Sequence, residues 1–122
     1  LAFPSFTSIG DSRAKSEAKM IASIIRYLND SAQSTKTALS LKIDFTRKLL
    51  SYQDPDGEKE ERCQSIRSVE LMSKGMVSEG EVTFVFGPTG AGENLSIRVG
   101  EDNNVVAIGF NFLSGRVTTK DE

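Results

Sequence analysis

A single helical pattern at the start of the chain, followed only by strand patterns, most constrains what this sequence can fold into. Apolar side chains recur there at steps of one, three and four, at Ala18, Ile21, Ala22, Ile25, Leu28 and Ala32. This spacing places them on one face of a helix with 3.6 residues per turn. The opposite face carries Arg13, Lys15, Glu17, Lys19, Arg26 and Asp30. The pattern predicts one helix from near Pro4 to about Ala32, half on a core and half in water.

The rest of the chain has the alternation of β-strands. In Thr37–Phe45, apolar side chains alternate with polar ones, and Leu49–Gln53 follows as the expected hairpin partner. Further strands are expected at Glu81–Phe86, Asn94–Val99, Val105–Phe112 and Arg116–Thr119. We expect a polar loop at Asp54–Gln64, and Ile66–Val77 has no clear pattern. About six strands after one helix predict an α+β fold with antiparallel sheets.

Length and composition indicate one globular domain. The chain has 122 residues, of which 38% are hydrophobic and 26% charged, as is usual for a water-soluble protein. We therefore expect a single domain over 1–122, with the helix in residues 1–33 and a β-rich part in 34–122. No segment has the eighteen or so apolar residues of a membrane span. Because the chain begins without Met, this tells nothing about a segment upstream of Leu1.

The net charge of -2 conceals an uneven distribution. Residues 1–53 hold eight basic and four acidic side chains, a balance of +4, whereas residues 54–122 hold seven and thirteen, a balance of -6. The asymmetry is typical of a solvated surface, and it also fits electrostatic complementarity between identical subunits. No run of Lys and Arg is dense enough to indicate nucleic-acid binding.

The residue types present argue against catalysis and bound cofactors. The chain has no His, and Cys63 is its only cysteine, in a polar stretch with no identifiable base. The acidic residues of Asp54–Glu61 have the ligand type for calcium, but they lack the third ligand before Gly57 and the distal bidentate Glu. The segment Gly87–Glu93 lacks the Gly-Lys-Ser/Thr ending of a phosphate loop. We expect a non-enzymatic protein without catalytic residues, metal or cofactor, and hairpin turns in both segments.

Several pieces of the chain, in their order, resemble the type IV pilin-like proteins. They are Leu1-Ala2-Phe3-Pro4-Ser5-Phe6, the helix segment Glu17–Leu28, the strand Leu41–Phe45, the loop Phe84–Gly90 and the closing Ser114–Val117. The closest resemblance is to the minor pseudopilins of type II secretion called GspH and to their pilus relatives called FimT. The family's processing signal, its glutamate near the mature N-terminus and its apolar half-helix are absent, and we infer that they were removed to give a soluble domain.

The resemblance implies a structural subunit of a secretion pseudopilus, which assists protein export through the outer membrane. Its partners would be other pseudopilins in a filament, and the missing apolar helix would hold it in the inner membrane with this domain in the periplasm. Filament contacts would involve Leu1, Phe3, Pro4, Phe6 and Ile9. The alternative is a FimT-like minor pilin that binds DNA. The C-terminal end argues against DNA binding, because it has only Arg116 and Lys120 as basic residues, beside two acidic ones.

Overall fold

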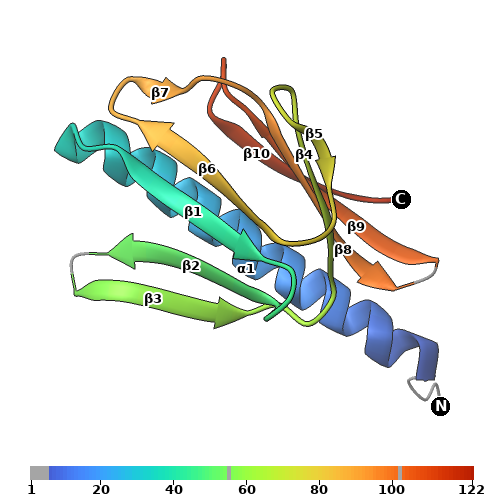
Figure 1. Cartoon of the computed structure of the whole chain (residues 1–122). Coiled ribbons are helices and arrows are strands. Elements are labelled where there is room, and N and C mark those ends of the chain that lie inside the picture. Colours follow the sequence, from blue (N-terminus) through green and yellow to red (C-terminus); the bar gives the residue numbers. More distant parts are fainter. Residues whose placement is uncertain (1–5, 55, 102) are drawn as a thin grey trace, which may run out of the picture.

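The described part of the chain forms one helix and ten strands (Figure 1). The computed structural model describes residues 6–54, 56–101 and 103–122, with the helical side chains from Arg13 onward. Helix α1 spans Phe6–Thr35. The strands are β1 (Leu39–Asp44), β2 (Leu49–Asp54), β3 (Gly57–Arg62), β4 (Ile66–Leu71), β5 (Gly75–Val77), β6 (Glu81–Gly87), β7 (Gly90–Ala91), β8 (Leu95–Glu101), β9 (Asn104–Asn111) and β10 (Arg116–Asp121).

The strands form two five-stranded sheets. Sheet A has the order β3-β2-β1-β6-β7, and sheet B has the order β10-β9-β8-β4-β5. Every pair of neighbouring strands is antiparallel. The chain crosses between the sheets after β3, β5 and β7. The expected α+β arrangement, one helix packed against antiparallel sheets, is confirmed, although the described chain has ten strands rather than about six.

Helix α1 packs against both sheets, and this explains the width of its apolar face. It contacts β8, β9 and β10 of sheet B and β1, β6 and β7 of sheet A. The buried apolar side chains of its described part are Ala14, Ala18, Ile21, Ala22, Ile24, Ile25, Leu28 and Ala32. Ile24 lies outside the predicted stripe and is only 6% exposed. The predicted apolar stripe omits Ile24 because two sheets cover a wider sector of the helix than one sheet would.

The C-terminal end of α1 differs from the prediction by three residues. The helix continues to Thr35, because Ala32 packs in the core and overrides the weak helix propensity of the polar residues before it. Lys36 then adopts a left-handed conformation with φ of 57°. The N–H of Thr37 donates to the carbonyl of Ala32 at 3.1 Å, which is the bond that closes a Schellman motif.

The predicted loop at Asp54–Gln64 is wrong. Most of it forms β3, which pairs along its whole length with β2 from Leu49↔Arg62 to Asp54↔Gly57. The side chains of β3 are almost all exposed, so its sequence lacks the apolar alternation from which a strand is predicted. The unassigned segment Ile66–Val77 forms β4 and β5, which pair with each other.

The core lies where the two sheets meet beside the helix. Leu41 and Ile43 are fully buried and Phe45 is 9% exposed, so the inward face predicted for this strand is confirmed. Three phenylalanines join the sheets by edge-to-face contacts. The ring centroid of Phe110 in β9 lies 6.1 Å from that of Phe84 and 5.4 Å from that of Phe86, both in β6.

Candidate functional site

The residues predicted to make filament contacts cannot be placed. Leu1, Phe3 and Pro4 lie outside the described residues. Phe6 and Ile9 belong to the first turns of α1, whose side chains also lie outside the description. Their role stays a prediction.

The acidic segment Asp54–Glu61 and the glycine-rich segment Gly87–Glu93 each contain the turn of a β-hairpin. At the β2–β3 turn, Asp54 accepts the N–H of Asp56 at 2.8 Å and lies 3.8 Å from the ammonium of Lys59. Among the described residues, no three Asp, Glu or Cys side chains gather as metal ligands. Gly87 and Gly90 pair across the β6–β7 hairpin, where a Cβ on Gly87 would lie 2.8 Å from the carbonyl oxygen of Gly90. The glycine therefore serves a close approach between two strands.

Cys63 is fully buried although its neighbours in the sequence are polar. Its Sγ lies 3.5 Å from Oε1 of Glu17, whose carboxylate also accepts the N–H groups of Gln64 at 3.0 Å and Ser65 at 2.9 Å. Burial, followed by the nearby Glu17 carboxylate, raises the pKa of the Cys63 thiol far above its usual value. A thiol held protonated in this way is a poor nucleophile.

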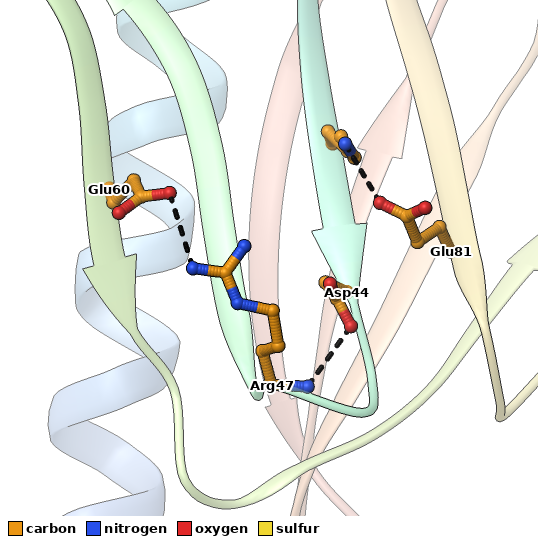
Figure 2. A network of polar contacts seen from close by, with 5 residues as sticks. Asp44, Arg47, Glu60 and Glu81 are labelled. Carbon is orange, nitrogen blue, oxygen red and sulfur yellow. Dashed lines mark hydrogen bonds and ion pairs between the residues drawn. The ribbon is translucent and has the colours of Figure 1, made fainter.

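The outer face of sheet A carries a chain of polar contacts (Figure 2). The ammonium of Lys42 in β1 lies 2.8 Å from the carboxylate of Glu81 in β6, and this hydrogen bond raises the Lys42 pKa. The guanidinium of Arg47 lies 3.9 Å from Glu60 in β3, while its backbone N–H donates to Asp44 at 3.0 Å. All these groups are exposed to solvent or nearly so. These contacts join β1 to β6 and the β1–β2 turn to β3, and they are exposed ion pairs of the kind that contribute little to stability.

The outer face of sheet B is hollowed into a groove of about 690 Å³. One cross-strand row crosses it, formed by Glu70 in β4, Ser96 in β8, Gly109 in β9 and Thr118 in β10. The surface is depressed along this row because Gly109 has no side chain. A Cβ on Gly109 would already lie 3.2 Å from Oγ1 of Thr118. Glycine within a strand commonly marks such a close approach.

Three turns form the rim of this groove at one end of sheet B, and side chains hold them together. Glu93 accepts the N–H of Ser73 at 2.9 Å and its hydroxyl at 2.8 Å, which fixes the β4–β5 turn. Asn94 accepts the N–H of Phe112 at 2.9 Å, and Asn111 accepts the N–H of Leu113 at 2.9 Å. The rim is therefore organised before anything binds, which lowers the entropic cost of recognition.

The rim also displays large apolar side chains. Met72 in the β4–β5 turn is 78% exposed and Leu113 in the β9–β10 turn is 82% exposed. Within the groove, Arg116 and Glu70 contribute charges of opposite sign, and Ser96, Ser114 and Thr118 contribute hydroxyls. Exposed apolar side chains beside a groove are a feature of surfaces that bind other proteins.

Sequence reasoning missed this groove because it depends on register. Alternation shows that Ser96, Gly109 and Thr118 share the outer face of their strands, but it does not show that they stand in one row. Gly109 within Val105–Phe112 was an available signal. The turn residues Asn94 and Asn111 were another, since asparagine side chains commonly bond to nearby backbone N–H groups.

The basic side chains near the C-terminus are partly neutralised. The guanidinium of Arg98 lies 2.8 Å from Glu122 and 3.6 Å from Glu70. Arg116 and Lys120 stand on the same strand as Asp121. Among the described residues, no helix combines the length and apolar character that crossing a bilayer requires.

A scan against protein-family models, a search of curated proteins and a search of solved structures each give no significant match to this chain.

Proposed function

We propose that this domain is a structural subunit of a pilin-like filament, specifically a minor pseudopilin of type II secretion. In this proposal the domain lies in the periplasm, an apolar helix upstream holds the intact product in the inner membrane, and other pseudopilins are its partners. The domain itself performs no chemistry. It contributes a helix to the filament core and a folded surface to neighbouring subunits.

The observation that carries the proposal is the relation of the helix to the sheets. Helix α1 has 30 residues, a length of about 45 Å at 1.5 Å per residue. The strands have at most eight residues, about 27 Å at 3.4 Å per residue. The first turns of α1 extend past the strand ends in Figure 1. In this proposal the N-terminal part of the helix makes contacts outside the domain.

The groove on sheet B supplies the second contact surface in this proposal. Its rim exposes Met72 and Leu113 on turns that are fixed by hydrogen bonds. Methionine and leucine adapt to a partner's shape and gain free energy when they leave water. We assign this rim to contacts with the globular domain of a neighbouring pseudopilin.

Site-directed cross-linking in the source bacterium tests the assignment. Cys63 is buried, so a cysteine introduced as Leu113→Cys becomes the reactive thiol. We expect a heterobifunctional reagent, which bonds this thiol at one end and a lysine amine of a neighbour at the other, to link this variant to another pseudopilin. The matched control is Val85→Cys, a 53% exposed position on the outer face of sheet A, which should give no such product.

Deletion of the gene tests the function independently of the surface. Exoproteins should accumulate in the periplasm and disappear from the medium, and the intact product should fractionate with the inner membrane. Normal secretion in the deletion strain, or a cytoplasmic location of the intact product, would exclude the proposed role.

A further inference from the structure

The four sheet edges differ in how well they are protected against pairing with another strand. Within the described residues, β3 and β7 are the edges of sheet A, and β5 and β10 are the edges of sheet B. Strand β3 has five charged side chains among six residues, β7 has two residues and β5 has three. Short length and dense charge are the usual protections of an edge. Strand β10 is longer than β5 and β7 and less densely charged than β3: its six residues have Arg116, Lys120 and Asp121 toward the ends and Val117, Thr118 and Thr119 between them.

The register identifies which backbone groups of β10 face outward. Asp121 stands opposite Val106, and the N–H of Glu122 donates to the carbonyl of Val105 at 2.8 Å. Hydrogen-bonded pairs alternate along an antiparallel ladder. The N–H and C=O groups of Val117, Thr119 and Asp121 therefore point away from β9. Arg26 of α1 supports this, because its guanidinium donates to the outward carbonyl of Val117 at 3.4 Å.

We propose that β10 pairs with β10 of a second copy of this chain, antiparallel and about a two-fold axis at Thr119. Thr119 then faces its own counterpart, and Val117 faces Asp121 of the other copy. The outward groups of these three residues form about six backbone hydrogen bonds, two for each facing pair. The two B sheets become one continuous ten-stranded sheet.

Charge complementarity selects this register. Val117 and Asp121 share the face of the sheet that α1 covers. Asp121 of the second copy therefore approaches the Arg26 guanidinium, which donates to the carbonyl of Val117. On the outer face, Arg116 stands opposite Glu122 of the second copy, which already pairs with Arg98 of its own chain at 2.8 Å, so the main ion pair of this register is the one between Arg26 and Asp121. The two-fold axis makes each of these contacts occur twice.

The neighbouring symmetric registers are worse. Centring the two-fold axis on Val117 brings the two Arg26 guanidinium groups together. Centring it on Asp121 places the two Asp121 carboxylates opposite each other. It also shortens the overlap, because only one residue of each strand follows the axis. Like charges placed directly opposite destabilise a strand pair. The axis at Thr119 combines the longest overlap with opposite charges at both ends.

The contact is isologous and closes on itself, so it is distinct from any repeating filament contact and does not rest on the proposed function. A single pair of six-residue strands buries less than a standard interface of about 1,600 Å². We expect a weak dimer that forms at high protein concentration and dissociates as added salt screens its exposed ion pairs.

Sedimentation equilibrium of the purified domain at low salt tests the proposal. Asp121 is exposed at the end of its strand, so Asp121→Arg leaves the fold intact and sets two cations against each other. We expect its dimer dissociation constant to rise at least about tenfold. Adding Arg26→Asp restores opposite charges, and the double variant should return to within about threefold of the original value.

Two further measurements make the result specific to β10. Arg62→Asp applies a similar charge reversal on the edge strand of sheet A and should leave the dissociation constant unchanged. Hydrogen exchange at the Thr119 amide should slow as protein concentration rises. A domain that stays monomeric at millimolar concentration, a dimer indifferent to Asp121→Arg, or a double variant that does not recover would each overturn the proposal.

Discussion

The carboxylate of Glu17 joins helix α1 to the segment that carries the chain from sheet A to sheet B. It accepts hydrogen bonds from the backbone N–H groups of Gln64 and Ser65 and from the Ser65 hydroxyl. The helical pattern assigned Glu17 to the solvated face together with Lys19 and Arg26. Nothing else in the sequence indicates this contact, because the N–H groups that donate to Glu17 lie 47 and 48 residues away.

Replacing Glu17 with Ala should destabilise the domain by about 1–3 kcal/mol, because the N–H and hydroxyl of buried Ser65 lose their acceptor. The midpoint of urea unfolding measures the change. Lys19→Ala is the control, since it removes an exposed charged side chain from the same helix. Equal midpoints for the two variants would show that the Glu17 contacts contribute nothing to stability.

Glu93 makes the β4–β5 turn sensitive to acid. The backbone N–H of Ser73, followed by the Ser73 hydroxyl, lowers the pKa of the Glu93 carboxyl. Because the folded-state pKa is the lower one, the contact stabilises the turn above the ordinary glutamate pKa and is lost as pH falls through the depressed value. The Ser73 amide resonance should therefore titrate with a midpoint below that of an unperturbed glutamate. Glu93→Gln should abolish this titration, and a midpoint at or above the ordinary value would contradict the prediction.

At the scale of elements, strands with regular apolar alternation were predicted, whereas the charged edge strand β3 and the strand β4, whose register shifts between Ile66 and Ser68, were not. The strand at Leu39–Asp44 was predicted because Leu41 and Ile43 point into the core. Strand β3 was missed because its side chains are exposed and charged, and only its pairing with β2 makes it a strand. An edge strand of this kind leaves no hydrophobic period in the sequence.

The β8–β9 hairpin depends on glycine at position 100. Gly100 has φ of 124°, and a Cβ there would lie 1.8 Å from the carbonyl oxygen of Asn104. Gly100→Ala should therefore cost more than about 2 kcal/mol, because strain and a backbone clash act together. Gly92→Ala is the control, with no neighbour within 4 Å and no left-handed φ, and should change stability by less than about 0.5 kcal/mol. Thermal denaturation that ranks the two variants equally would contradict this.

At the scale of the whole molecule, the order of one helix and then antiparallel strands was open to prediction, but the surfaces were not. The groove on sheet B needs Glu70 and Thr118 to meet in one row although 48 positions separate them in the sequence. Such non-local register follows from how whole strands pair, and no local pattern encodes it. The free edge at β10 is likewise a property of the strand order.

The proposed function makes its sharpest prediction at the N-terminal end of the helix. In the intact gene product, Phe6→Asp should prevent incorporation into the pseudopilus, because a charge buried among packed helices without a partner costs several kcal/mol. In this proposal Phe6 makes its contacts in the filament, so the isolated domain should keep its melting temperature. Immunoblots of sheared pseudopili, together with circular dichroism of the domain, measure the two effects. Ser16→Asp, on the exposed face of α1, is the matched control and should incorporate normally. If Phe6→Asp also enters the filament, the N-terminal part of the helix does not make the assembly contact, and the role proposed for this chain fails with it.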